Sequence, residues 1–362
     1  AQSDNPISYF SFLGRFLTTV RAVGMYFRLL VFPWTLSPDY SHGGVPAVGS
    51  FADPEGWVPL LSLIGVGFCT VYWLRKRVFL SGVLGVLVFA VALAPVSNFV
   101  ITIGTILGER LLYFPTIGFA LLLGAGLIEL LDRRVLGWAL LGAILLILAV
   151  RTGVRNRDWR DDRTLFEAAL ASGYGGAKIH YNLGVTYRKA GERNRAIAAF
   201  EQVARLRPWD AKNWLNLGTV YVELERHKEA LVAFERAWEQ KPNWPQVYVK
   251  TGLVHEALGD LDRAKAAYQT GLDRLPEARD LHYELARLLG RDRNYKEAIW
   301  HCLAVLDGNL EHFDAVRLLG ALYLDDGQYE KALAVCRMGL ERWPGNESLE
   351  GMARVAQDKV TE

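Results

Sequence analysis

The chain has 362 residues, 51% of them hydrophobic, and a formal net charge of +2 at pH 7. Lys and Arg residues are interleaved with acidic residues, so the composition predicts no nucleic-acid partner. Cys69, Cys302 and Cys336 have no C-x-x-C spacing, and the sequence therefore predicts neither a metal site nor a thioredoxin-type motif. Because the chain opens with "AQSDNPISYF", without a starting Met or a basic signal region, we expect it to be a piece of a longer polypeptide.

Residues 1–157 carry nearly all the long apolar runs and are predicted to form a membrane domain. A helix needs about 20 apolar residues to cross a bilayer, because its backbone must satisfy its own hydrogen bonds there. Residues 9–34 are one candidate, with Arg15, Arg21 and Arg28 near one helix face; this segment either lies along the interface or crosses while facing a polar cavity. Four further runs are predicted to span: 57–74, 78–96, 111–131 and 135–150.

Two short basic loops indicate how these helices are oriented. "RKR" at 75–77 and "DRR" at 132–134 lie between closely spaced runs, and the positive-inside rule places such loops in the cytoplasm. Five arginines between 151 and 163 conflict with this orientation, because they follow the last predicted span. On balance the sequence predicts an integral membrane protein in contact with membrane lipids, with everything after residue 150 on the extracytoplasmic side, in a periplasm or an equivalent lumen.

Residues 158–362 form a second predicted domain, in which the sequence repeats every 34 residues. One position holds Gly in four units and Ala286 in the fourth, and such small residues let two helices cross closely. Cys302 and Cys336 share another position and are predicted to be small packing residues, because equivalent atoms of neighbouring repeats usually lie beyond disulfide reach. The pattern is typical of a tetratricopeptide-repeat solenoid with units at 177–210, 211–244, 245–278, 279–312 and 313–346 and a closing helix at 347–362. The predicted fold class is therefore all-α, with polytopic membrane helices followed by this solenoid.

The first helices of such repeats line a concave groove, the usual binding surface of a solenoid. Asn182 and Asn216 occupy the same groove-facing position in successive units. An Asn amide both donates and accepts hydrogen bonds, so the pair could hold an extended protein or peptide ligand by its backbone. The alternative is that both residues cap turns or face solvent. The row is interrupted by Lys250, Glu284 and Leu318.

The two halves together resemble a known family. "DNP" near the start, "LSPDYS" at 36–41, the later "VP", and "PVSNF" followed by "GERLLYFPTIGF" are similar to the membrane segment of the transmembrane and tetratricopeptide repeat-containing O-mannosyltransferases. The C-terminal repeats complete the order of that family, and bacterial relatives share the arrangement. The resemblance covers essentially the whole chain.

The resemblance implies a lipid-dependent membrane glycosyltransferase. Such enzymes take a sugar from a polyprenyl- or dolichyl-phosphate donor, which is a substrate rather than a bound cofactor, and transfer it to an acceptor hydroxyl. Their catalytic acids lie in the first outer loop, near the natural N-terminus. We therefore expect no catalytic residue in this chain, and an inactive protein unless the preceding part is supplied.

Two pairs of residues are candidates for the outer cavity that the resemblance implies. Arg110 could meet the donor phosphate with its planar set of donors, while Glu109 holds that arginine or contacts the acceptor. The alternative is an interfacial Arg that reaches lipid headgroups beside a solvated Glu. Asp39 and Tyr40 could line the same cavity, or form an ordinary turn before a Gly pair.

These observations support three competing hypotheses about function. The leading hypothesis is the C-terminal part of a membrane glycosyltransferase, with the repeats recruiting a protein acceptor or partner. The alternative is a non-enzymatic, membrane-anchored scaffold for an envelope assembly. A third is transport of a lipid-linked sugar, which needs a continuous polar path. Paired acids between two further spans upstream would favour the enzyme.

Overall fold

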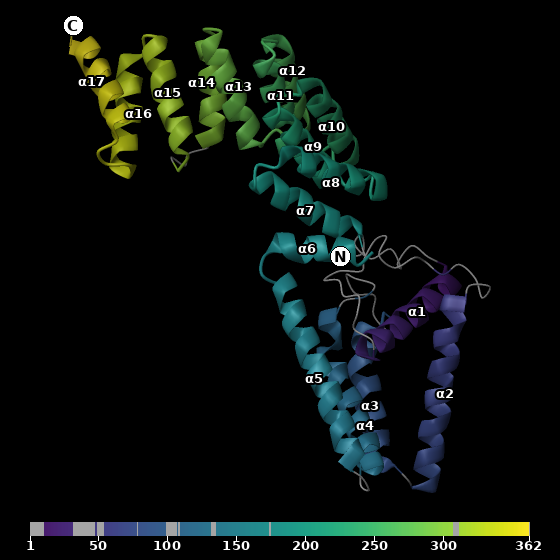
Figure 1. Cartoon of the computed structure of the whole chain (residues 1–362). Coiled ribbons are helices and arrows are strands. Elements are labelled where there is room, and N and C mark those ends of the chain that lie inside the picture. The colour runs from purple at the N-terminus through teal and green to yellow at the C-terminus, as the bar shows by residue number, and fades with distance from the viewer. Residues whose placement is uncertain are drawn as a thin grey trace. The chain divides into compact units, whose positions relative to one another are not determined.

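The computed structural model describes residues 11–31, 48, 54–77, 79–98, 107, 109–131, 135–173, 175–306 and 311–361. Every regular element in these ranges is a helix, in agreement with the all-α prediction. The chain divides into two compact units, Ala1–Pro208 and Trp209–Glu362, and each is described by itself (Figure 1).

The first unit begins with apolar helices. The α-helices are α1 (Phe12–Val31), α2 (Pro54–Lys76), α3 (Leu80–Leu93), α4 (Tyr113–Leu131) and α5 (Val135–Asp158), with 3₁₀ turns η3 (Ala94–Val96) and η4 (Glu109–Leu112) between α3 and α4. Among the described residues one helix, Val58–Lys76, is long and apolar enough to cross a membrane. Shorter apolar helices cover Leu80–Val96 and Tyr113–Gly126. A chain that crosses the membrane several times therefore stays a prediction.

Helix α1 packs through one face. Its side chains Val23, Tyr26 and Leu29 are buried in a cluster that also contains Phe89 and Leu93 from α3. Arg15 and Arg28 of the same helix are exposed, and Arg21 is half-buried.

Helices α3 and α4 approach each other at two glycines. A Cβ placed on Gly118 would lie 2.3 Å from the backbone nitrogen of Phe89, and one on Gly85 would lie 2.6 Å from the backbone nitrogen of Leu122. The two backbones therefore touch where side chains would normally separate them. Small residues at such crossings are typical of helices that associate in lipid, where close van der Waals packing replaces the hydrophobic effect.

The first unit ends with helices α6 (Asp162–Ala171), α7 (Ala177–Lys189) and α8 (Arg193–Leu206). Asp161 begins α6 with a capping box, because its carboxylate accepts from the Thr164 backbone N–H at 2.8 Å and the Thr164 hydroxyl accepts in return. Ile179 and Leu183 of α7 are buried against Ala169 and Ala199.

The second unit consists of paired helices. They are α9 (Ala211–Glu223), α10 (His227–Gln240), α11 (Pro245–Ala257), α12 (Leu261–Arg274), α13 (Arg279–Arg291), α14 (Tyr295–Leu306), α15 (Phe313–Asp325), α16 (Tyr329–Arg342) and α17 (Glu347–Thr361). Each 34-residue repeat contributes two antiparallel helices, and α17 follows the last pair (Figure 1). This is the repeat architecture that the sequence period predicts.

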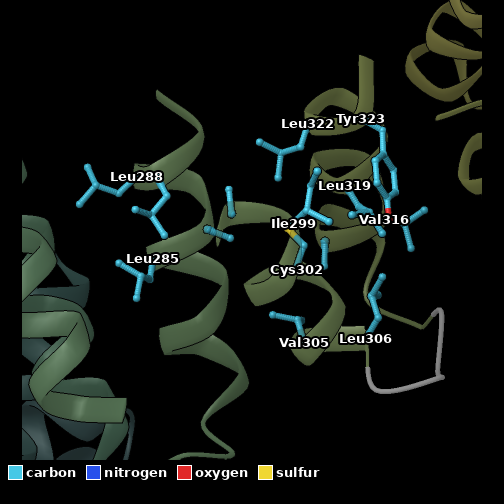
Figure 2. Packing of buried hydrophobic residues seen from close by; sticks show 14 of the residues in the cluster. Leu285, Leu288, Ile299, Cys302, Val305, Leu306, Val316, Leu319, Leu322 and Tyr323 are labelled. Carbon is cyan, nitrogen blue, oxygen red and sulfur yellow. The ribbon is translucent and has the colours of Figure 1, made fainter. Parts of the chain in front are cut away.

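The core of the second unit is continuous from α11 to α17. Figure 2 shows Ile299 and Cys302 of α14 close to Leu319 of α15, while Leu285 of α13 extends the same cluster on the other side of its helix. Cys302 and Cys336 are both buried and free of disulfides, as expected for small packing residues. Burial of these side chains stabilises each helix pair against its neighbours.

Candidate functional site

The residues predicted from the sequence fall in different parts of the described structure. Glu109 and Arg110 lie in η4, but their side chains lie outside the described residues, as do Asp39 and Tyr40 altogether. Asn182 is half-buried on α7 in the first unit. Asn216 is half-buried on α9 in the second unit. The two asparagines thus belong to separate compact units, and their use as a pair stays a prediction.

A cavity of about 270 Å³ marks the groove side of the second unit. It lies between the first helices of the third and fourth repeats, α11 and α13, and is closed at one end by the residue before α15. Its lining residues are Gln246, Val249, Lys250, Leu253, Asp280, Tyr283, Glu284 and His312. We call this site the α11–α13 groove.

An aromatic pair closes one end of the groove. The rings of Tyr283 and His312 have centroids 5.4 Å apart and are tilted by 30°. His312 is the N-cap of α15, where its Nδ1 accepts from the Ala315 backbone N–H at 3.2 Å. The neutral ring then carries its proton on Nε2, which remains a donor. Burial of Tyr283, together with nearby Asp314, raises the pKa of its phenol, so that hydroxyl stays protonated and can also donate.

An ion network beside the groove holds one of its lining side chains, Glu284. The Arg287 guanidinium donates to Glu256 at 2.5 Å and to Glu284 at 2.9 Å, and Arg291 donates to Glu256 at 3.0 Å. The Glu256 side chain is 9% exposed and also accepts from the Tyr268 hydroxyl at 2.7 Å. Because Glu256 belongs to α11 and both arginines to α13, the network connects two repeats and holds Glu284 in place at the groove.

The α11–α13 groove offers groups of several kinds to a ligand. Lys250 supplies a cation, Asp280 and Glu284 supply carboxylates, and Val249 and Leu253 supply apolar surface between them. Such a combination suits an extended peptide, whose backbone and side chains need donors, acceptors and apolar contacts at short intervals. Within the described ranges, no group of three or more His, Cys, Asp or Glu side chains could hold a metal ion.

Sequence reasoning missed the residues that line this groove. Lys250 and Glu284 stand at the repeat position of Asn182 and Asn216, where they interrupt the predicted row of Asn residues. Tyr283 lies one residue before that position in its repeat. The signal that could have found them is the repeat position itself, since residues that face a groove need not be identical from one unit to the next.

The fold places the second unit, with part of the first, in the class of tetratricopeptide-repeat proteins. Family models of the tetratricopeptide repeat match residues 187–250, 249–307 and 301–347 of this chain. The structure of "YrrB: a TPR protein with an unusual peptide-binding site" is similar, with a TM-score of 0.42, 22% identity, and coverage of 52% of this chain and 97% of that one.

The N-terminal residues and several curated relatives show what this chain is similar to. Residues 1–66 match "Protein O-mannosyl-transferase TMTC, DUF1736". Protein O-mannosyl-transferase TMTC4 of Mus musculus is 33% identical over 205 residues, which cover 54% of this chain and 27% of the relative. Protein O-mannosyl-transferase Tmtc3 of Drosophila melanogaster is 30% identical over 217 residues, covering 57% and 23%. The chain is thus similar to TMTC O-mannosyl-transferases, and it spans about a quarter of the length of these relatives.

Proposed function

We propose that this chain is part of a membrane glycosyltransferase that transfers mannose from a polyprenyl- or dolichyl-phosphate donor to a hydroxyl group of a protein acceptor. The observation that carries the proposal is the joint occurrence, in one chain, of the region matched at residues 1–66 and the tetratricopeptide repeats that follow it. The repeats bind the acceptor in this proposal, and the apolar helices hold the protein at the lipid-linked donor.

The membrane arrangement is part of the proposal. Helices α2 to α5 all lie in lipid, residues 1–157 act as the membrane domain, and residues 158–362 form the repeat domain on the extracytoplasmic side. The basic residues that end α2, Arg75 and Lys76, support this orientation through the positive-inside rule. A reporter that is active only in the cytoplasm, fused after Glu362, should stay silent. Activity of that reporter would place the repeats in the cytoplasm.

Acceptor binding is proposed along the first helices of the repeats. Asn182 and Asn216 would hold peptide backbone, and the α11–α13 groove would take side chains, with Lys250 next to an acidic residue of the acceptor and Leu253 next to an apolar one. The mixed charge of the groove supports a peptide more than a lipid chain, because a lipid chain needs no closely spaced donors and acceptors.

Donor binding is proposed at η4, with Arg110 against the phosphate, Glu109 beside it, and Asp39 and Tyr40 in the same outer cavity. A leaving phosphate needs a fixed positive charge, and the Arg fork matches its oxygens in a way that Lys does not. Arg110→Lys should therefore lower the turnover of the full-length protein about tenfold, and Arg110→Ala further, without loss of thermal stability.

A lipid-headgroup anchor at Arg110 would behave differently in the same assay. Lys reaches an interface nearly as well as Arg, so an anchor predicts near-normal turnover for Arg110→Lys. The assay uses dolichyl-phosphate mannose and the full-length protein. Full turnover of Arg110→Ala would remove Arg110 from the donor site.

A further inference from the structure

A second cavity lies in the second unit, apart from the α11–α13 groove. It has a volume of about 350 Å³ and lies between α10, α11 and α12. Its walls are mostly apolar, with Phe234 and Trp238 from α10 and Val247 from α11, while Val232 and Glu235 stand on the exposed side of α10. A cavity of about 150 Å³ already holds benzene in an apolar protein core, so this one has room for an indole ring.

The cavity has a cause in the repeat sequence. The seventh residue of the other four repeats is Leu, and each of these leucines is at most 3% exposed, but the third repeat has Thr251. The eleventh residue is Tyr or Leu in the other four, but the third repeat has His255. Both exceptions line the cavity. Two smaller or more polar side chains thus leave open the space that the other repeats fill from the same positions.

The wall opposite these residues is held in place. The Trp238 indole Nε1–H donates to the Tyr248 hydroxyl at 2.7 Å, and that hydroxyl donates to the Pro242 carbonyl at 2.7 Å. The Arg274 guanidinium lies 5.5 Å from the Trp238 ring. These contacts keep Trp238 from turning into the cavity. Apolar surface that is open to water is unfavourable, so its presence where two substitutions would fill the cavity points to an occupant.

The second helix of another repeat carries an exposed apolar side chain whose size matches the cavity. Trp300 of α14 is 60% exposed and occupies the repeat position of Val232, and Leu303 beside it is 47% exposed. The Trp300 ring packs edge-on against His301, with centroids 4.8 Å apart, so it is already ordered before it meets a partner. Ordered aromatic side chains lose little conformational entropy on binding and are frequent hot spots of interfaces.

The charged residues beside the cavity and beside Trp300 are complementary. Glu235 is exposed beside the cavity, and Lys296 lies one helical turn before Trp300 on the same face of α14. When a Trp300 side chain enters a cavity of another copy, Lys296 approaches Glu235. Because each copy carries one cavity and one Trp300, a two-fold axis forms both contacts at once and closes the assembly as a dimer.

We propose that this protein self-associates by inserting Trp300 of one copy into the cavity between α10, α11 and α12 of a second copy. The occupant is thus an indole side chain of the same chain. This surface is separate from the α11–α13 groove, so a dimer leaves acceptor binding open.

The test measures disulfide crosslinking between two differently substituted full-length chains in detergent micelles. Both chains carry Cys69→Ser, which removes the exposed thiol. One chain carries Glu235→Cys and the other Lys296→Cys. Mixed oxidation should yield the crosslinked pair. Adding Thr251→Leu with His255→Tyr to the first chain should lower the yield at least tenfold while thermal stability holds or rises, because these residue types fill the same positions in other repeats.

A surface variant checks the same contact without touching the core. Trp300→Ala in the Lys296→Cys chain should lower the yield by a similar factor, whereas Trp209→Ala, which removes another exposed Trp, should leave it unchanged. An unchanged yield after the cavity is filled would overturn the proposal. So would a chain that stays monomeric in sedimentation while N-acetyl-tryptophanamide binds the cavity, because the occupant would then come from another protein.

Discussion

Glycine permits close packing both in the apolar helices of the first unit and in the repeats. The neighbour that packs against the glycine differs: it is the backbone of another helix in the first unit and a side chain in the repeats. Between α3 and α4, a Cβ on Gly118 would meet backbone, 2.3 Å from the Phe89 nitrogen. In the third repeat, a Cβ on Gly252 would meet a ring, 2.1 Å from Cε1 of Tyr268. In lipid, helices gain association from close backbone contact, whereas in water they gain it by burying large side chains.

The exposed side chains differ in the same way. On α5, Leu145, Leu146 and Ile147 are 57%, 66% and 56% exposed, a continuous apolar surface that water does not favour. In the repeats, Leu217 and Leu285 are 3% and 0% exposed. The two regions of the chain thus differ in where their apolar side chains lie, exposed on α5 and buried within the repeats.

The largest effect is expected from Gly118→Ala. The added methyl group meets the backbone of α3, which cannot turn aside as a side chain can, so the helices must separate. We expect a loss of about 3 kcal/mol in the free energy of unfolding, at the upper end of overpacking costs. Thermal unfolding of the full chain in detergent micelles, followed by circular dichroism, measures it.

Gly124→Ala is the matched control, because it lies on the same helix and a Cβ there has no neighbour within 4 Å. It should unfold at the wild-type temperature or slightly above it, since Ala favours helix over Gly. Equal unfolding temperatures for Gly118→Ala and Gly124→Ala would show that α3 and α4 do not pack through backbone contact.

Gly252→Ala should cost somewhat less, about 2 kcal/mol, because the ring of Tyr268 can shift where a backbone cannot. In the fifth repeat the partner is a thiol, and a Cβ on Gly320 would lie 3.0 Å from Cys336 Sγ. Gly320→Ala should therefore cost less than about 1 kcal/mol. Urea unfolding of both variants checks the order, and a larger loss at Gly320 would contradict this account of the repeat core.

The same contact explains one exception in the sequence. The sequence predicts a small residue at this repeat position in every unit, and Ala286 is fully buried there in the fourth. The facing residue of that repeat is Cys302 rather than Phe or Tyr, so one methyl group can be accommodated. Repeat register, helix pairs and packing cysteines could thus be predicted from period and residue size.

The groove could be predicted only in part. The period predicts that first-helix positions line a groove, and the structure has a cavity between the first helices α11 and α13. It does not show that Tyr283 and His312 stack, or that Arg287 connects Glu284 to Glu256 of the preceding repeat, because these side-chain contacts depend on residues that the repeats do not share. The cavity beside Thr251 was missed for a related reason, since it depends on what α10 and α12 leave unfilled.

A smaller effect concerns a buried histidine pair in the repeats. The Nδ1 atoms of His282 and His301 lie 2.7 Å apart, and Nε2–H of His282 donates to the Pro276 carbonyl. His282 Nδ1 is then the acceptor and His301 Nδ1–H the donor. Burial, with a further contribution from His282, lowers the pKa of His301 to about 4. The unfolded chain, with a pKa near 6.5, therefore takes up this proton first as pH falls.

The stability that this pair contributes is complete above about pH 7 and is lost as pH falls toward 4, with a loss of roughly 2 kcal/mol by pH 5. His301→Asn keeps a donor for His282 but does not titrate, so its unfolding midpoint should change less between pH 7 and pH 5 than that of the wild type. Parallel pH dependence in the two proteins would mean that His301 is not the group responsible.

The proposal that the repeats select the acceptor is tested most directly by steady-state mannose transfer with the full-length protein. Lys250→Glu reverses a charge in the α11–α13 groove, and Lys228→Glu makes the same change at an exposed site on α10. We expect Lys250→Glu to raise the KM for a protein acceptor about tenfold with kcat unchanged, because a remote groove contributes binding but no chemistry. Lys228→Glu should match the wild type. Equal KM values for the two variants, or a loss confined to kcat, would contradict the account.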